Sequence, residues 1–218
     1  KSLTFSPAIL IIGFVLLGLI IGYGAHVYSV ITNGMKHWKK DREEKKQREI
    51  GSIYREGVGR LLSGDLKKAR GLLNKALDRD PKRVDTLIAL ATLDSQEGNP
   101  AEGLSVLRKA RELDPKSMEV LFKTAAIQEE TGEDDDAIAT YQELIALEKD
   151  NRKALRAMRD LYIKHDRWQD ALDIQRRVLK AGPAASRVAE EKELLLFLRY
   201  EVARQAIADG SPNDAKSE

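Results

Sequence analysis

The sequence predicts an all-α protein, in which an N-terminal transmembrane helix is followed by an α-solenoid of helix–turn–helix repeats of 34 residues. Three observations predict it. Gly64, Gly98 and Gly132 stand 34 residues apart, and the residues around them repeat in the same phase. Residues 8–31 contain no Asp, Glu, Lys or Arg. A period of this length is typical of stacked helical repeats, because one repeat cannot bury its own apolar face.

The N-terminal segment, residues 1–35, is predicted to hold the transmembrane helix. A helix over residues 8–31 would be about 36 Å long, enough to cross a bilayer with some tilt. The alternative is a cleaved signal peptide, which would need a shorter apolar core and a basic start. Here the basic cluster follows the apolar run. Because excess basic residues mark the cytoplasmic flank, we expect a single pass with the repeats in the cytoplasm.

Two further features of this region predict contacts. Gly18 and Gly22 have the GxxxG spacing that lets a second membrane helix approach closely, although this spacing also arises by chance. Residues 36–49 lack Gly and Pro and are predicted to form a basic helical linker. Its cationic side chains either contact anionic lipid headgroups or are simply solvated. The predicted headgroup contacts are Lys36, Lys39, Lys40, Arg42, Lys45 and Lys46.

Residues 50–183 are predicted to hold four repeats, each a pair of antiparallel helices. The glycine ends the first helix, since it adopts a left-handed conformation without steric cost. A small residue follows five positions later and a bulky apolar residue four positions after that. Seventeen positions after the glycine, where the second helix should end, stands a proline or lysine. In order, these positions hold Ala69, Gly103 and Ala137; Leu73, Leu107 and Tyr141; and Pro81, Pro115 and Lys149.

The fourth repeat departs from this pattern and a fifth begins. The fourth has His165–Trp168 at the turn in place of a glycine, although Pro183 keeps the phase. After a lengthened helical stretch, Gly210 and Ala215 again stand five residues apart. We therefore interpret residues 184–218 as the start of a fifth, lengthened and truncated repeat. A solenoid normally ends in a polar cap, so we expect the polypeptide to continue.

Composition argues against several function classes. The chain has no cysteine, which excludes disulfides and thiolate metal sites, and its three histidines are scattered. No phosphate-binding loop or nucleophile–base pair is present, so we expect no cofactor, no metal and no enzymatic activity. Asp134–Asp136 lie at a helix start, where they face the positive end of the helix dipole. The net charge is +2, of which Lys1 contributes +1 and the linker +3. The rest is not basic, which argues against nucleic-acid binding.

The repeats resemble the tetratricopeptide repeat (TPR) family in period, turn glycine, small residue and closing proline. The resemblance implies that the first helices of successive repeats line a concave groove for segments of other proteins. The alternative is that several of these side chains pack against the neighbouring helix. The Lys/Asn clamp of chaperone-binding members is missing, because Tyr54, Val58 and Ala89 occupy the equivalent positions. The groove candidates are Tyr54, Val58, Ile88, Thr92, Phe122, Ala126, Arg156 and Asp160.

The arrangement also resembles the LapB family of bacterial lipopolysaccharide assembly proteins, which have one membrane helix, a charged linker and cytoplasmic repeats. Trp168–Ile174 and Arg187–Glu190, followed by a lengthened helix, are similar to its junction between the fourth and fifth repeats. Residues 6–28 and the basic run after them also resemble the second membrane helix of LapA, its partner. The family's C-terminal zinc module, with paired CxxC motifs, has no counterpart here. It would lie in the expected continuation of the polypeptide.

These resemblances imply a membrane-tethered cytoplasmic TPR adaptor at the bacterial inner membrane. Its partners would be the lipid bilayer and other proteins, namely an FtsH-type membrane protease or lipopolysaccharide enzymes. The alternative is a generic TPR scaffold or assembly factor of another inner-membrane complex.

Overall fold

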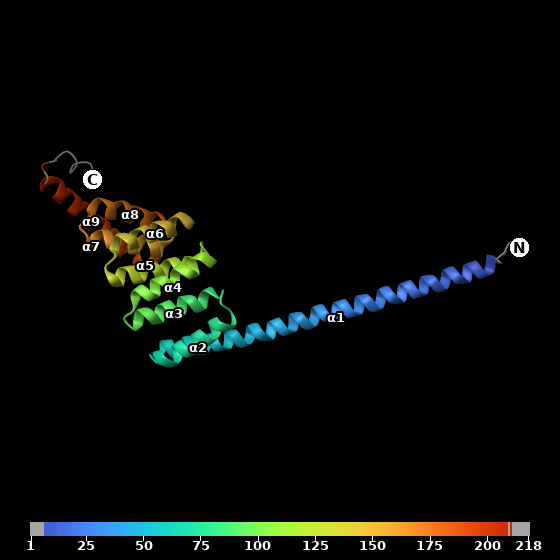
Figure 1. The fold of residues 1–218 in the computed structure, drawn as a ribbon. Helices are drawn as coiled ribbons and strands as arrows, with labels where there is room; N and C mark the ends of the chain where they lie inside the picture. Colours follow the sequence, from blue (N-terminus) through green and yellow to red (C-terminus); the bar gives the residue numbers. More distant parts are fainter. Residues whose placement is uncertain (1–6, 209, 211–218) are drawn as a thin grey trace. The chain divides into compact units, whose positions relative to one another are not determined.

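The structure, a computed structural model, describes residues 7–208 and residue 210. The chain divides after Ile53 into two parts. Helix α1 (Pro7–Leu62) runs through the first part and supplies the first helix of the second (Figure 1). The second part continues with α2 (Leu66–Arg79), α3 (Val84–Gln96), α4 (Pro100–Leu113), α5 (Met118–Thr131), α6 (Asp134–Leu147), α7 (Arg152–Lys164), α8 (Trp168–Lys180), the 3₁₀ helix η1 (Ala185–Arg187) and α9 (Val188–Ala208).

In the first part, the segment expected to be a linker is helical and solvent-exposed. Glu44 pairs with Lys40 at 3.9 Å and with Arg48 at 3.3 Å, each one helical turn away. The Arg42 guanidinium lies 5.5 Å from the centroid of the Trp38 ring. Pairs with this spacing each stabilise an exposed helix by a few tenths of a kcal/mol (roughly 0.2–0.5). Local charge pairing therefore supports the helix where apolar burial does not.

The expected membrane span lies within α1, and residues 8–31 are helical. Within the part of the chain that the structure describes, no helix is both long enough and apolar enough to cross a bilayer. Most side chains of residues 8–31, and those of Lys36 and Lys39, lie outside the described residues. A Cβ added to Gly18 or Gly22 would meet no described atom within 4 Å. The span and the helix contact stay predictions.

The 34-residue period of the sequence is also the period of the helices in the second part. Helices α2 to α9 pack in chain order, each against its neighbours, and α3 also contacts α5 (Figure 1). This arrangement confirms the predicted all-α solenoid. The second helices of the four repeats begin at Leu66, Pro100, Asp134 and Trp168, and the first helices α3, α5 and α7 begin at Val84, Met118 and Arg152.

The turn within each repeat has one backbone geometry, including the repeat without a turn glycine. Gly64, Gly98 and Gly132 have φ values of +78°, +82° and +77°. Asp166 stands 34 residues after Gly132 and has a φ of +53°. Aspartate is among the few residues with a side chain that enter this region. The fourth repeat therefore keeps the left-handed turn, which the sequence pattern had left open.

The end of α9 shows the same turn. Gly210 has a φ of +74°, and its N–H donates to the carbonyl of Ile207 at 3.2 Å. The N–H of Gly132 donates in the same way to Glu129, three residues before it, at 3.1 Å. The same turn also follows α8, where Gly182 has a φ of +73°, so it does not distinguish a first from a second helix. The fifth repeat stays a prediction.

The two helices of a repeat approach closely at the small residue of the second helix. This position is buried in every repeat, and in the second repeat it is a glycine. A Cβ on Gly103 would lie 2.9 Å from the carbonyl oxygen of Ala91 and 3.3 Å from Cδ1 of Ile127. The backbone oxygen cannot turn aside like a side chain, so only glycine fits between α3, α4 and α5 here.

Replacing Gly103 with alanine should therefore lower the free energy of unfolding by about 1–3 kcal/mol, the usual cost of overpacking a core. The matched control is Gly71→Ala in α2, an exposed helical position where a Cβ would meet nothing within 4 Å. This control should gain about 0.5–1 kcal/mol from helix propensity. Urea unfolding followed by circular dichroism measures both, and a stabilising Gly103→Ala would contradict the close approach.

Candidate functional site

The predicted groove residues lie in equivalent positions on successive first helices. Ile88 is only 5% exposed and belongs to the core, so it presents little surface. Asp160 is exposed, and the other six are half-buried. The pairs are Tyr54 and Val58 at the end of α1, Ile88 and Thr92 on α3, Phe122 and Ala126 on α5, and Arg156 and Asp160 on α7.

At the first repeat, Tyr54 contacts a charged residue at the start of the next first helix. The Arg83 guanidinium lies 5.2 Å from the centroid of the Tyr54 ring and pairs with Asp85 at 2.9 Å. Burial raises the pKa of Tyr54, and the negative charges of Asp85 and Glu119 raise this pKa further. The contact with Arg83 places the Tyr54 ring at the start of α3.

At the third and fourth repeats, Lys153 connects two of the predicted residues. Its Nζ lies 4.6 Å from the centroid of the Phe122 ring, close enough for a cation–π contact. The Phe122 ring also meets Tyr141 edge to face, with centroids 6.2 Å apart. Lys153 also lines a pocket together with Arg156. Phe122, Lys153 and Arg156 thus form one surface across α5 and α7.

The pocket beside Lys153 has a volume of about 630 Å³ and lies between the start of α7 and η1. Four of its side chains are cationic and two are anionic, so the lining carries a net charge of +2. Arg152 donates to the carbonyl of Gly182 at 2.8 Å, and Arg156 donates to Glu191 at 2.6 Å. The lining residues are Glu148, Asp150, Asn151, Arg152, Lys153, Arg156, Ala184 and Arg187.

The charge at one position of the repeat changes along the solenoid. Asp85, Glu119 and Lys153 are the second residues of α3, α5 and α7, and Arg187, the last residue of η1, stands 34 residues after Lys153. This row runs from two acidic to two basic side chains. Sequence analysis missed this row, although the period was enough to find it.

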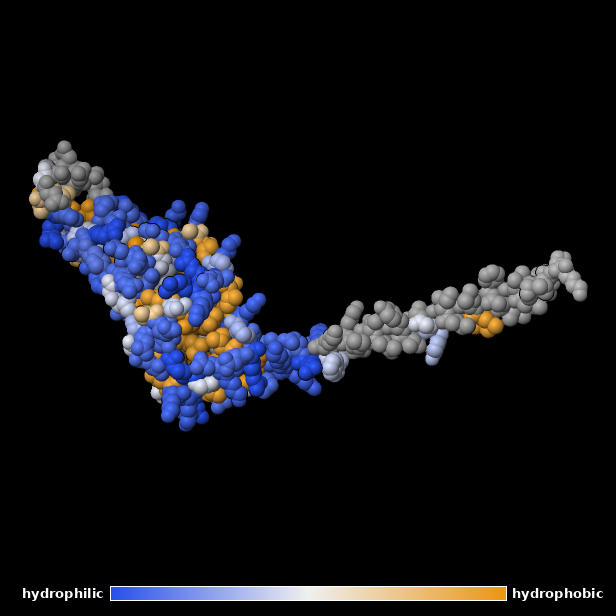
Figure 2. Space-filling model, viewed as in Figure 1, coloured by the Kyte–Doolittle hydropathy of each residue, from blue (hydrophilic) through white to orange (hydrophobic). Residues whose placement is uncertain are grey.

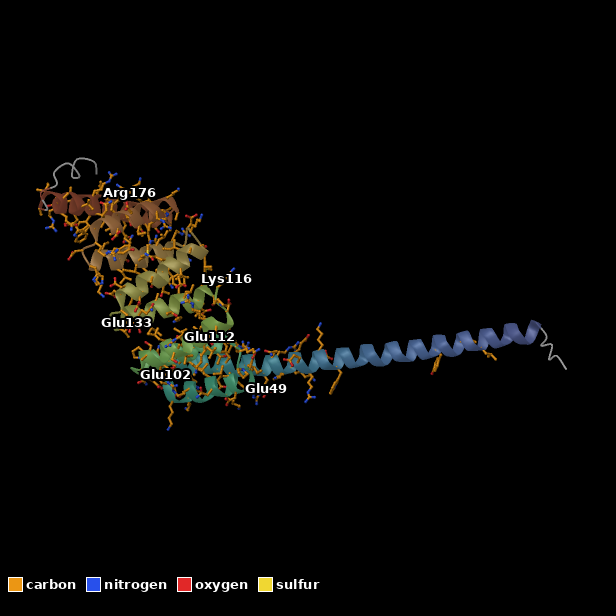
Figure 3. The ribbon with its side chains drawn as sticks, turned by 45° about the horizontal axis from the view of Figure 1, so that its top comes forward. Glu49, Glu102, Glu112, Lys116, Glu133 and Arg176 are labelled. Carbon is orange, nitrogen blue, oxygen red and sulfur yellow. The ribbon has the colours of Figure 1, made fainter. Side chains whose placement is uncertain are left out.

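Figure 2 shows apolar surface over α3, α4 and α5 and mostly hydrophilic surface towards α8 and α9. Figure 3 shows charged side chains on every repeat, such as the labelled Glu102, Glu133 and Arg176.

Next to this pocket, a buried polar network joins α7, α8 and α9. The carboxylate of Glu191 accepts from Arg159 Nη1 at 2.7 Å and from Arg156 Nε at 2.6 Å. Gln175 Nε2 donates to the same carboxylate at 2.9 Å and to the Glu191 carbonyl at 2.7 Å. Arg159 Nη1 also donates to Gln175 Oε1 at 2.7 Å. Because Arg159, Gln175 and Glu191 are all buried, their hydrogen bonds replace water that these groups have lost.

The network occupies positions that are apolar in the other repeats. Arg159 stands where the earlier repeats have Gly57, Ala91 and Ala125. Gln175 stands where they have Leu73, Leu107 and Tyr141. Sequence analysis did not include this site, and the signal was the break in both series at the fourth repeat.

The network makes stability depend on pH in the acidic range. Burial alone would raise the pKa of Glu191, but donation from Gln175 and Arg156 and the positive charge of Arg159 bring this pKa below its ordinary value. A lowered folded-state pKa stabilises the fold above the ordinary glutamate value of about 4.3, and this contribution is lost as pH falls through the folded-state pKa. The free energy of unfolding should therefore fall between neutral pH and about pH 3, and fall less in Glu191→Gln. Equal acid sensitivity of the two proteins would contradict this assignment.

The acidic cluster at the start of α6 has a structural contact. Asp134 is buried and pairs with Lys164 at 2.5 Å and with His165 at 2.7 Å, which joins α6 to the end of α7. Donation from Lys164 lowers the pKa of Asp134 despite its burial, and His165 lowers it further. Among the described residues, no group of three or more His, Cys, Asp or Glu side chains could hold a metal ion.

Comparison with known proteins agrees with the helix pairs. The family model for the tetratricopeptide repeat matches residues 60–120 and residues 94–159. No curated protein matches the chain.

Several solved structures share the fold. A crystal structure of MamA protein is 21% identical, with a TM-score of 0.56 over 78% of this chain and 87% of that one. YrrB, described as a TPR protein with an unusual peptide-binding site, is 19% identical, with a TM-score of 0.54 over 66% and 74%. The first TPR of Spaghetti (RPAP3), bound to an HSP90 peptide, is 17% identical, with a TM-score of 0.50 over 54% and 95%. The helix pairs, the turns and the matched segments agree: residues 60–159 of this chain match the tetratricopeptide repeat family model, and the solved structures share its fold.

Proposed function

We propose that the chain is a non-enzymatic TPR scaffold that binds peptide segments of other proteins along its first helices. The observation that carries this proposal is the surface that Phe122, Lys153 and Arg156 form across α5 and α7, continued by the pocket of about 630 Å³. An extended or helical segment needs such a surface, with apolar contacts and a few polar groups that fix its position. The peptide-binding structures of YrrB and Spaghetti support the proposal by similarity of fold.

A peptide selection tests this function directly. A phage-displayed random peptide library is selected on the full chain, and the selected peptides are synthesised with a fluorescent label. Ala126→Glu places a charge on the surface between α3 and α7, whereas Ala139→Glu places one on the exposed face of α6. Ala126→Glu should weaken binding by about tenfold or more, because the new carboxylate would be desolvated under the peptide. A selection that yields no peptide, or equal loss in both variants, would overturn the proposed function.

A LapB-like role is the more specific form of this proposal, and it rests on the resemblance in sequence. In this form residues 8–31 span the bacterial inner membrane once, the repeats lie in the cytoplasm, and the basic side chains of residues 36–49 contact lipid headgroups. Co-purification of an FtsH-type protease or lipopolysaccharide enzymes from detergent-solubilised membranes would support it. A different inner-membrane complex would favour the generic scaffold, and digestion of the repeats from outside intact cells would contradict the cytoplasmic location.

A further inference from the structure

We propose that the pocket between α7 and η1 binds carboxylate side chains of an acidic peptide segment. The proposal rests on the proposed peptide-binding function and names the chemistry of the bound segment. It assigns the anion contacts to Lys153 and Arg187, with Arg152 and Arg156 at the pocket wall.

The first argument is the charge that the fold leaves unpaired. Arg156 is paired with Glu191, and Arg152 is held by the carbonyl of Gly182. Within the described residues, neither Lys153 nor Arg187 has a carboxylate partner, and Lys153 contacts only the face of the Phe122 ring through its charge. Arg70 differs, because it is paired with both Asp94 and Glu97.

The second argument is rigidity, because the groups that shape the pocket are held in place. Asn151 accepts from the backbone N–H of Ala154 at 3.0 Å and so caps α7. The contact of Arg152 with Gly182 fixes the loop before η1 against the start of α7. The buried network holds Arg156 from the opposite side. The backbone and the wall of the pocket are thus ordered before a ligand binds, and the conformational entropy lost on binding is mainly that of the exposed Lys153 and Arg187 side chains.

The third argument concerns the kind of anion and the orientation of the peptide. Glu148 and Asp150 also line the pocket, and they would repel a dianionic phosphate more than single carboxylates. The row is acidic at Asp85 and Glu119 and basic at Lys153 and Arg187. The acidic end of a bound segment therefore lies at the fourth repeat, and the rest of the segment runs past Phe122 of the third repeat towards Tyr54 of the first.

The experiment uses two amidated, fluorescein-labelled peptides and the full chain. The acidic probe is Gly-Leu-Phe-Gly-Glu-Asp-Glu-Asp, and its neutral counterpart is Gly-Leu-Phe-Gly-Gln-Asn-Gln-Asn. Fluorescence anisotropy should show the acidic probe binding at least about tenfold more tightly, with affinity falling as sodium chloride rises from about 50 to about 300 mM. The double substitution Lys153→Gln with Arg187→Gln should abolish this preference. The control pair Lys75→Gln with Lys109→Gln removes two exposed lysines from α2 and α4 and should preserve it.

Several results would overturn the assignment. These are equal binding of the two probes, a preference that survives the double substitution, or tighter binding of a phosphoserine version of the acidic probe. Circular dichroism confirms that the double variant folds, and retained binding of the neutral probe controls for indirect damage. The library selection separates the two proposals, because neutral or basic selected peptides would leave peptide binding intact and remove only the acidic preference.

Discussion

Replacing Glu191 with alanine should lower the free energy of unfolding by about 2–4 kcal/mol, because it removes the buried carboxylate that accepts from three side chains of the network. Arg159 keeps its pair with the exposed Asp160 at 2.7 Å, which limits the loss. The Arg159 side chain is only 9% exposed, so its guanidinium does not recover full hydration in this variant. Gln175 loses the carboxylate that its Nε2 donates to, at a position with no solvent exposure. Urea unfolding measures the loss, and hydrogen exchange locates it in α7, α8 and α9.

The matched control for this prediction is Glu190→Ala. Glu190 precedes Glu191 on α9 but is exposed, so its removal should change stability by no more than about 0.5 kcal/mol. A similar small loss in Glu191→Ala would mean that the network is hydrated in solution.

Replacing the whole network with apolar residues should have the opposite outcome. The triple variant Arg159→Ala, Gln175→Leu, Glu191→Leu gives the fourth repeat the residue types that the earlier repeats have at the first two positions. Because no charge is left buried, we expect stability equal to that of the parent or higher by about 1–4 kcal/mol. Arg156 loses its partner in this variant, but it lines the open pocket and can turn its charge towards solvent.

Comparison of this triple variant with Glu191→Ala separates two explanations. If the network stabilises the fold by its own favourable interactions, both variants lose stability. If it is costly only when broken, the triple variant recovers what Glu191→Ala loses. A triple variant that unfolds as readily as Glu191→Ala would refute the second explanation, which we favour on the desolvation cost of three polar side chains.

The repeat solenoid was predictable because period, turn and small residue are local and recur. The left-handed turn at Asp166 was also within reach, because the 34-residue count places Asp166 at the position of Gly132, although aspartate alone is no signal for this geometry. The charged row from Asp85 to Arg187 was within reach of the sequence, because it needs only that count. The pocket was not predictable, because its wall depends on how the loop around Gly182 and η1 folds back onto Arg152.

The buried apolar residues of the second part fall into three clusters of unequal size, and this has a consequence for motion. The largest extends from α5 to α9, while two smaller ones lie among the end of α1, α2, α3, α4 and one side of α5, which contributes Val120 and Ile127. In a solenoid each repeat is stabilised mainly by its neighbours, so opening can begin at one end without unfolding the whole. Amide protons should therefore exchange faster in α2 to α4 than in α6 to α8. A peptide bound across the first helices would then contact repeats that rarely open at one end and repeats that open more often at the other. Opening of the repeats around α2 to α4 would therefore set the rate at which the peptide dissociates.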